Sequence, residues 1–511
     1  MDIKFAKKYI LNNKMDVQNA NASLAVASPV YYAYANSDDI HKVDFTPVFF
    51  FYIYEENLKH FQLIKEETVN ALAKKIYDNY LNDSKSLRRM INNHLLVIKK
   101  MDQEFYNYSL HRNNLSAELM FNFFKKFLDL SLIFWKYSSI GEDKGEIIDS
   151  VIIPKFAQKQ KMNLKNAREI FTALSWPEEM SFLNLERMHF LELCLLIIKN
   201  KQYLNYLSNN QLDRLAQIKE INRSVGLYLK ENFWIKSDFC KSRVLSVNSV
   251  LNDLKNEIQA KGRKKISQEL YLIKNTYSSA LKRKKILSKK IKLSRIEKAN
   301  VNFAAKTIYW IDQRKLGQCK FFYYSCLFFE DLEKFFGIKY DDLLNYDCFD
   351  ILNFLKRKEK IKPQVMSSRK KSFLAVFENN KKISYFYGKE VKAIFLKSLG
   401  VSGQETKGRV ASTGNKKIIR AIARIVSNPL RDTFNKNEIL ITSMTRIEFV
   451  PLMRKAVAIV TNEGGIACHA AVVSRELGIP CVIGTKDATK IFKDGDKIEV
   501  NTSTGVIRKI K

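Results

Sequence analysis

Residues 461–484 read TNEGGIACHAAVVSRELGIPCVIG and decide the fold of the C-terminal part of the chain. The apolar run Val457–Val460 precedes them and is typical of a buried strand. A helix is predicted over His469–Leu477, because Gly478 follows it as a stop signal. A second short strand is predicted at Cys481–Ile483. The pattern is therefore strand, glycine turn, helix and strand, with one histidine at the start of the helix.

A histidine in that position suits phosphoryl chemistry. The first turn of a helix offers unpaired backbone N–H groups and a partial positive charge, which together bind phosphate. Gly464 and Gly465 let the backbone approach such an anion, and the neutral imidazole of His469 can attack phosphorus to form a labile N–P bond. The neighbouring side chains, Cys468 and Ala470 among them, are small and leave room for a donor and an acceptor. The alternative is that His469 is an ordinary helix-start residue.

Other site chemistry has little support in the sequence. The remaining histidines lie far from His469, and only His189 and Glu192 form an HxxE pair, without an apparent third metal ligand. Cys468 and Cys481 have no identifiable base partner that would make either a nucleophile. We therefore expect no metal site in this chain.

The composition favours a globular protein with polyanionic partners. The chain has 511 residues, 46% of them hydrophobic, and a net charge of +34, which suggests about three domains with large cores. The charge favours nucleotides and acidic protein surfaces as partners. Nucleic acid is not expected, because no arginine-rich stripe or RNA-binding signature accompanies the lysines.

Cysteine usage and hydropathy predict a cytoplasmic protein. The seven cysteines form no CxxC pair, and the N-terminus, MDIKFAKKYI, has no secretory apolar core. The most apolar region, Leu119–Trp135, is interrupted by Lys125, Lys126 and Asp129. A bilayer-spanning helix needs about 20 predominantly apolar residues, so we expect no membrane span.

The first part of the chain predicts a mainly helical region with small β elements. Thr46–Tyr54 reads as a buried strand that pairs with His60–Ile64. Helical spacing of apolar residues dominates from residue 66, and a second hairpin is predicted from Ser372–Phe377 and Ile383–Tyr387. The expected divisions are a mixed segment at 1–65, a helical domain at 66–389 and an α/β domain at 390–511.

Two features of the helical region stay open at this stage. Val250–Lys298 reads as one or two long basic helices; its charge run at 281–295 is by default a solvated face, and alternatively an electrostatic docking surface. The tryptophans are expected to be core residues, with a substrate pocket as the alternative; they are Trp135, Trp176, Trp234 and Trp310.

The last part of the chain alternates short strands and helices, as a compact α/β domain does. A glycine-containing loop is predicted at 403–414 and a helix at 448–455. The predicted strands are 418–426, 438–443, 457–460 and 480–483, followed by a terminal pair at 497–501 and 505–509.

Residues 400–509 resemble the swivelling phosphohistidine domain of the enzymes that use phosphoenolpyruvate (PEP). That group includes PEP synthase, pyruvate phosphate dikinase, rifampicin phosphotransferase and, more distantly, enzyme I of the sugar phosphotransferase system. The motifs that carry the resemblance are GG and CHAA at 464–471, RELGIP at 475–480, EILIT at 438–442, AVAIVT at 456–461 and DGD at 494–496. The resemblance implies that His469 carries the phosphoryl group, that Gly464, Gly465 and Ala470 bind phosphate, and that Thr445, Cys468 and Arg475 support the site.

The sequence departs from that family at four positions. Ala467 replaces a hydroxyl residue, which removes a possible phosphate contact; Ile466, Ile447 and Asn462 stand where arginine, proline and aspartate are common. The helical region resembles rifampicin phosphotransferase more weakly, in the segments YLKENFWI (228–235) and YDDLLNYDCFDILNFL (340–355).

Complete members of the family also need an ATP-grasp domain and an acceptor site. Residues 66–360 are helical and glycine-poor, unlike an ATP-grasp domain, and we do not expect a TIM barrel after residue 509. The resemblance therefore implies a separate ATP-grasp protein that brings ATP and Mg²⁺, and a small-molecule acceptor. The segment 388–403 is the candidate hinge. The alternatives are a catalytically silent docking or scaffold protein and, less favoured, a basic nucleic-acid-associated protein.

Overall fold

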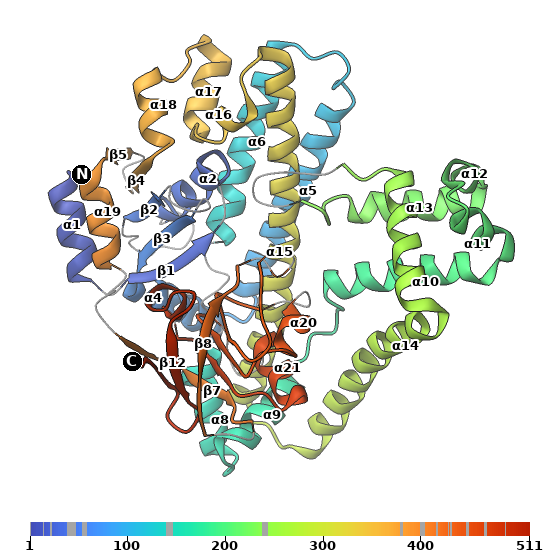
Figure 1. The fold of residues 1–511 in the computed structure, drawn as a ribbon, viewed down its shortest axis with the longest axis vertical. Helices are drawn as coiled ribbons and strands as arrows, with labels where there is room; N and C mark the ends of the chain where they lie inside the picture. The colour runs from blue at the N-terminus through green and yellow to red at the C-terminus, as the bar shows by residue number, and fades with distance from the viewer. Residues whose placement is uncertain are drawn as a thin grey trace. The chain divides into compact units, whose positions relative to one another are not determined.

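The computed structural model describes residues 2–13, 15–20, 23–37, 47–53, 59–138, 147–237, 244–378, 382–398, 404–414, 417–427, 429, 432–445, 449–463, 468–485 and 487–510. The chain folds into two compact units, Met1–Val391 (unit 1) and Lys392–Lys511 (unit 2) (Figure 1). Each unit is considered by itself. Among the described residues no helix is long and apolar enough to cross a membrane.

Unit 1 is mostly helical, as its spacing of apolar residues predicts. Its helices are α1 (Ile3–Asn12), α2 (Leu24–Ala35), α4 (Glu66–Asn82), α5 (Ser86–Ser109), α6 (Ala117–Ser138), the π-helix η1 (Ile148–Ile152), α8 (Ile153–Lys159), α9 (Leu164–Leu174), α10 (Phe182–Lys199), α11 (Lys201–Ser208), α12 (Leu212–Gln217), α13 (Lys219–Asn232), α14 (Val247–Lys290), α15 (Arg295–Phe336), α16 (Tyr340–Leu343), α17 (Cys348–Arg357), α18 (Pro363–Arg369) and the first residues of α19 (Lys389–Ser398).

One antiparallel sheet joins the beginning and the end of unit 1. Its strands are β1 (Met15–Ala20), β2 (Val48–Ile53), β3 (Lys59–Lys65), β4 (Ser372–Phe377) and β5 (Ile383–Tyr387), in the order β1-β3-β2-β4-β5. Both predicted hairpins are confirmed, since β2 pairs with β3 and β4 with β5. β2 also pairs with β4, with Phe50 opposite Ala375. Residues 1–65 therefore share one sheet with residues 372–387.

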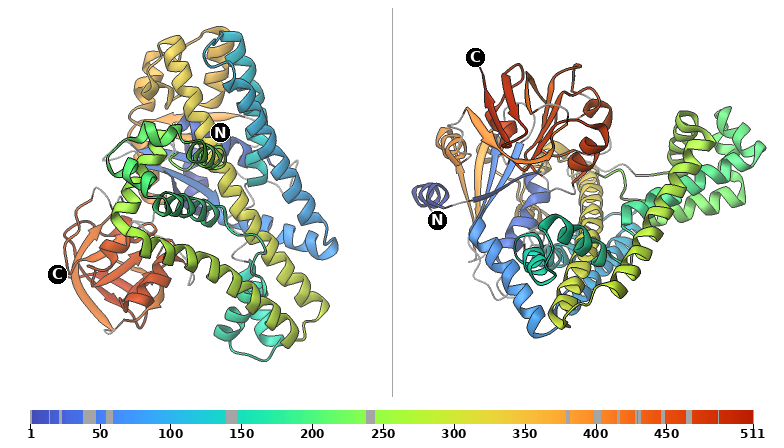
Figure 2. Two further views of the ribbon diagram at one scale, coloured as in Figure 1. Left: turned by 90° about the vertical axis from the view of Figure 1, so that its right-hand side faces the viewer. Right: turned by 90° about the horizontal axis from the view of Figure 1, so that it is seen from below.

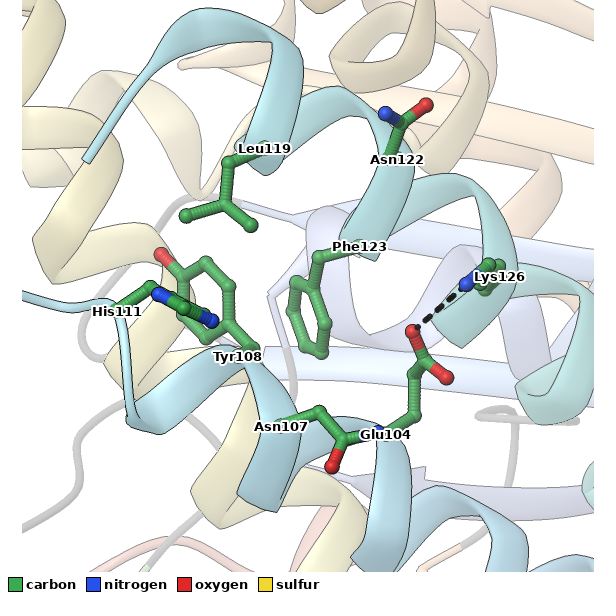
Figure 3. Close-up of a pocket in the computed structure, with 8 residues that line it drawn as sticks. All are labelled: Glu104, Asn107, Tyr108, His111, Leu119, Asn122, Phe123 and Lys126. Carbon is green, nitrogen blue, oxygen red and sulfur yellow. Dashed lines mark ion pairs between the residues drawn. The ribbon is translucent and has the colours of Figure 1, made fainter. Parts of the chain in front are cut away.

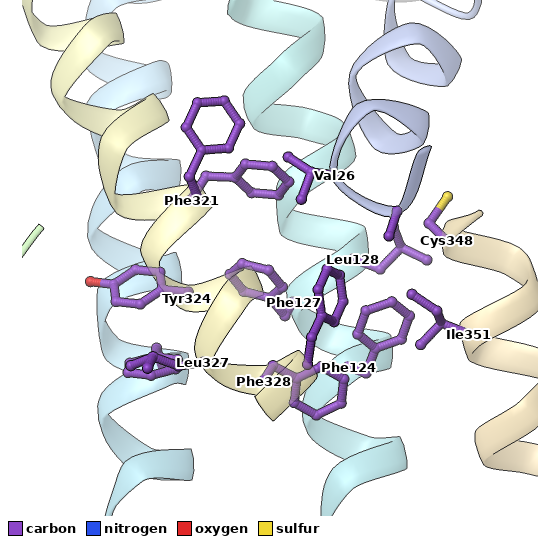
Figure 4. Close-up of a cluster of buried hydrophobic side chains, with 14 of the residues drawn as sticks. Val26, Phe124, Phe127, Leu128, Phe321, Tyr324, Leu327, Phe328, Cys348 and Ile351 are labelled. Atoms are coloured by element: carbon purple, nitrogen blue, oxygen red, sulfur yellow. The ribbon is translucent and has the colours of Figure 1, made fainter. Parts of the chain in front are cut away.

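Aromatic side chains fill the core between α2, α5, α6, α15 and α17 (Figure 4). Phe124 stacks on Phe328 with centroids 5.2 Å apart, and Phe127 stacks on Phe321 at 5.8 Å. Such offset stacks form because phenylalanines at i, i+3 and i+4 of one helix meet those of its neighbour. Trp135, Trp234 and Trp310 are buried, which confirms their prediction as core residues, and Trp176 is half-buried.

Helices α10 to α14 gather around an apolar cluster of their own (Figure 2). Of the one or two basic helices predicted at 250–298, α14 covers the range up to Lys290 and is interrupted at Gly262 with φ 65° and ψ 170°, and α15 begins at Arg295. Ser246 and Ser294 are the N-cap residues of α14 and α15, and each forms a capping box; the Ser294 hydroxyl accepts from the Glu297 N–H. Positive φ at Gly262 ends one straight segment and starts the next.

Unit 2 is built on an eight-stranded sheet of order β6-β13-β12-β8-β9-β10-β11-β7. Its strands are β6 (Glu405–Lys407), β7 (Arg409–Ser412), β8 (Ile418–Ile425), β9 (Ile439–Thr442), β10 (Ala458–Thr461), β11 (Cys481–Ile483), β12 (Lys497–Asn501) and β13 (Val506–Lys509), and its short helices are α20 (Val450–Met453), α21 (His469–Leu477) and α22 (Ala488–Ile491). Strands β8, β9, β10 and β11 are parallel neighbours. All predicted strands of this region are confirmed, and the predicted helix at 448–455 is shorter.

The structure differs from the loop expected at the start of this region and adds a helix to the expected linker. The loop predicted at 403–414 contains β6 and β7, because Thr406 pairs with Ile507 and Val410 with Val482. The linker predicted at 388–403 is helical over Lys389–Ser398. Its sequence KEVKAIFLKS places Val391, Ile394 and Phe395 at helical spacing, and all three are buried. Gly400 and Gly403 lie outside the described residues.

Candidate phosphohistidine site

His469 is the first residue of α21, directly after the N-cap residue Cys468. The helix runs to Leu477 and ends at Gly478, whose φ of 65° gives a left-handed C-cap. These are the bounds predicted from the sequence. Residues 464–467, with Gly464 and Gly465, lie outside the described part of the chain, as does the side chain of His469. Their roles as phosphate ligands and carrier stay predictions.

The site lies at the carboxyl ends of parallel strands, where open α/β sheets bind ligands. β9 and β10 are neighbours, with Thr442 opposite Thr461. Past their ends, the Asn462 N–H donates to the Thr442 carbonyl at 3.1 Å, and the Glu463 N–H donates to the Ser443 carbonyl at 2.9 Å. The segment that leads to the glycines is thereby held beside the segment that leads to Thr445.

Asn462 occupies its position for a structural reason. Its side-chain amide donates to the Thr489 hydroxyl at 2.6 Å, and its Oδ1 accepts from the Thr489 N–H at 3.0 Å. An ionised aspartate could still accept from the Thr489 N–H, but it has no N–H to donate to the Thr489 hydroxyl oxygen. This pair, which links β10 to α22, was not anticipated from the sequence. The departure of Asn462 from the family pattern was its only visible signal.

Ala470 is 1% exposed and packs, with Ala471 and Cys481, in the apolar cluster behind α21. Its side chain therefore serves the core, and any phosphate contact would have to come from its backbone. Burial raises the pKa of the Cys481 thiol to about 12, so that this cysteine stays protonated. Cys468 is half-buried against the same cluster and caps α21 without a side-chain hydrogen bond.

Arg475 and Thr445, both predicted to support the site, occupy different surroundings. The guanidinium Nε of Arg475 donates to the Ala411 carbonyl oxygen at 2.8 Å, which ties α21 to β7. This contact gives Arg475 a structural task. Thr445 is buried close after the end of β9, and the adjacent Met444 is 46% exposed. Thr445 thus follows β9, and His469 begins the helix that follows the adjacent strand, β10.

Unit 1 has a small hollow on its helical surface (Figure 3). It has a volume of about 210 Å³ and lies between α5 and α6, lined by Glu104, Asn107, Tyr108, His111, Leu119, Asn122, Phe123 and Lys126. The Tyr108 hydroxyl already donates to Asp331 at 2.9 Å, and Lys126 pairs with Glu104 at 3.5 Å. The hollow therefore carries no argument for an acceptor site. Within the described residues, no group of three or more metal-ligating side chains is found.

Comparison with known proteins supports the family resemblance that the sequence of unit 2 shows. Residues 434–505 match the family described as PEP-utilising enzyme, mobile domain. By this match, residues 434–505 are a PEP-utilising enzyme mobile domain. The match to this mobile domain begins just before β9 and includes α21, so it contains every predicted site residue.

Relatives of the mobile domain carry the name phosphoenolpyruvate synthase. The probable enzyme of Staphylothermus marinus is 42% identical over 121 residues, which are 23% of this chain and 14% of that protein. The enzyme of Pyrococcus furiosus is 43% identical over 120 residues, 24% of this chain and 13% of that protein. The enzyme of Aeropyrum pernix is 56% identical over 72 residues, 14% of this chain and 9% of that protein. The chain thus spans about a seventh or less of these relatives.

Among solved structures, the chain is similar to Thermococcus kodakaraensis aconitase X, with 19% identity over 21% of this chain and all of that one. The TM-score of 0.18 is too low to carry any argument.

Proposed function

We propose that this chain carries a phosphoryl group on His469 between a separate ATP-grasp protein and a small-molecule acceptor. The observation that carries the proposal is the position of His469, the first residue of α21 at the carboxyl end of the parallel strands, inside the matched mobile domain. The names of the relatives support phosphotransfer chemistry of the PEP synthase kind.

The chemistry follows from a neutral imidazole at a helix start. The lone pair of one ring nitrogen attacks phosphorus, an N–P bond forms, and the bond from phosphorus to the nucleotide oxygen breaks. In the second step an acceptor atom attacks the same phosphorus and the N–P bond breaks. The unpaired N–H groups in the first turn of α21 stabilise the phosphoryl oxygens in both states.

The nucleotide is proposed to bind outside this chain. Unit 1 is mostly helical, and its described strands form a single antiparallel sheet without a glycine-rich phosphate loop. ATP and Mg²⁺ would therefore come with the ATP-grasp partner. A carrier that visits two sites needs freedom to move. We place that freedom near Gly388, with φ 97°, at the start of the linker predicted at 388–403.

The test is phosphorylation of the purified full chain. The chain is incubated with candidate ATP-grasp proteins and with ATP labelled at the β or γ phosphate, and acid-labile label on the protein is measured. The proposal expects label that depends on the partner and is absent in His469→Ala. Label that persists in His469→Ala would place the phosphoryl group elsewhere.

A second candidate function is a catalytically silent docking module. Ala467 favours it, because the hydroxyl usual at that position is missing. Absence of label with every plausible partner would favour this reading. Salt-sensitive retention on RNA or heparin without any labelling would instead favour a nucleic-acid-associated protein.

A further inference from the structure

The second half of α14 has more exposed cations than the described carboxylates around it neutralise. Residues 270–296 contain no aspartate or glutamate. Five cations of this stretch are exposed, and among the described residues none of them forms an ion pair; they are Lys282, Arg283, Lys285, Lys289 and Lys290. Three other lysines of α14 are paired: Lys261 with Glu257 and Glu269, Lys274 with Glu192, and Lys284 with Glu178.

An exposed isoleucine lies in the middle of these cations. Ile286 is 53% exposed. Its helical neighbours at i−4, i−3, i+3 and i+4 are Lys282, Arg283, Lys289 and Lys290. Side chains at those spacings lie next to each other on a helix surface. We call Ile286 with these four cations the Ile286 ring.

A neighbouring face of the same helix end is held by the body of unit 1. Leu287 and Ile291 pack against the apolar cluster that contains Phe156 and Phe171 of α8 and α9. Unit 1 therefore fixes this end of α14 and leaves the Ile286 ring toward solvent. Like charges at i, i+3 and i, i+4, such as Lys282 with Lys285, destabilise a helix, and no local contact of the described residues compensates them.

A second acid-free segment lies beside the first. Residues 150–168 contain no acidic side chain, and Lys159, Lys161 and Lys165 are exposed. Gln160 joins the two segments, because its Nε2 donates to the Lys292 carbonyl at 3.4 Å and to Glu297 at 2.7 Å. The fold thus extends the basic surface with residues that are more than a hundred positions away in sequence.

We propose that the Ile286 ring is a docking site for an acidic protein surface that presents an apolar side chain. An apolar centre with a charged rim is the usual anatomy of a protein interface. A nucleic-acid backbone would use the cations but not the isoleucine, and residues 281–296 contain no aromatic ring for base stacking. The proposal stands independently of phosphotransfer by His469.

The test measures fluorescence anisotropy of a labelled 18-residue helical peptide, with glutamates around a single leucine stripe, against the full chain. Binding should weaken at least tenfold between 50 and 300 mM salt, and at least tenfold in Lys282→Glu/Lys289→Glu. Ile286→Gln should weaken it about fivefold. The matched control is Leu272→Gln, because Leu272 is 62% exposed on the same helix but has Gln268, Glu269, Asn275 and Thr276 as helical neighbours.

Two results would overturn the proposal. The first is an equal effect of Ile286→Gln and Leu272→Gln, or none from either, because the isoleucine would then add nothing to the charge. The second is a 20-base-pair RNA duplex that binds more tightly than the peptide and equally well to Ile286→Gln. The surface would then be a nucleic-acid site. Circular dichroism of each variant checks that α14 is intact.

Discussion

The guanidinium Nε of Arg475 donates to the carbonyl oxygen of Ala411 at 2.8 Å. This bond fastens the helix that begins with His469 to β7, at one edge of the sheet. Arg475 follows His469 by six positions, which places it off the face of the histidine in a regular helix. The arginine of the RELGIP motif therefore positions α21, whereas the proposed carrier, His469, lies at the other end of the helix.

Replacing Arg475 should loosen α21 without removing the carrier. Arg475→Gln should cost about 1 kcal/mol of local stability, seen as faster amide exchange in β7 and α21. Arg409→Gln, at an exposed position of the same strand, is the control and should leave exchange unchanged. If Arg475→Gln abolished phosphorylation with normal exchange, the arginine would act on phosphate instead.

Gly414 should tolerate no side chain. It has φ 53°, and a Cβ there would lie 2.5 Å from Cδ of Pro480, the residue before β11. Gly414→Ala should therefore destabilise unit 2 by about 2–3 kcal/mol, from strain and overpacking together. Gly478→Ala also has positive φ but meets nothing within 4 Å, so it should cost only about 1 kcal/mol. All four tryptophans lie in unit 1, so amide exchange is the suitable measurement. Equal losses would refute the steric argument.

The stability of unit 1 should depend on pH through Asp347. Burial, and then the charge of Asp350, raise the pKa of the Asp347 carboxyl to about 6, although Arg369 and the Tyr385 hydroxyl contact it. A raised folded-state pKa means that the native state binds this proton more tightly than the unfolded chain, so the contribution of Asp347 grows as the pH falls through 6. Between pH 7 and pH 5 the wild type should gain about 1 kcal/mol relative to Asp347→Asn. Urea denaturation followed by tryptophan fluorescence measures it, and a difference independent of pH would contradict the account.

Restoring the missing hydroxyl should speed phosphorylation. Ala467→Thr returns a donor that could bind a phosphoryl oxygen, and a hydrogen bond to a charged group contributes about 1.5–3 kcal/mol. If that bond forms only in the transition state, the labelling rate should rise about tenfold. Ala467→Val has a similar shape without the hydroxyl and should give no gain. Equal rates for the two variants would show that the hydroxyl is not used.

Sequence patterns predicted unit 2 closely because its strands are short, apolar and separated by glycine, proline and acidic turns. Both bounds of the helix that begins at His469 were predicted correctly, because Gly478 can adopt the left-handed C-cap conformation that ends it. β7 was missed because its sequence RVAS is not visibly a strand, and its pairing with β11 depends on residues far along the chain. Tertiary pairing of this kind overrides local propensity.

The helical region was harder to predict in detail. Periodicity gave the helices and both hairpins, but not the pairing of β2 with β4, which lie more than three hundred residues apart. The linker predicted at 388–403 contains the boundary between the units, but its helix was not predicted, although Val391, Ile394 and Phe395 have helical spacing. At the site, the Asn462–Thr489 contact could not be anticipated, since it needs the packing of α22 against β10.

The central claim is tested most directly by mapping the phosphorylated residue. The full chain is incubated with ATP, Mg²⁺ and an ATP-grasp partner, digested at alkaline pH to preserve N–P bonds, and sequenced by mass spectrometry. The account predicts one phosphoryl group on His469, lost after mild acid and absent in His469→Ala. An acid-stable phosphoryl group on another residue, or an unmodified His469 when the partner itself is phosphorylated, would contradict it.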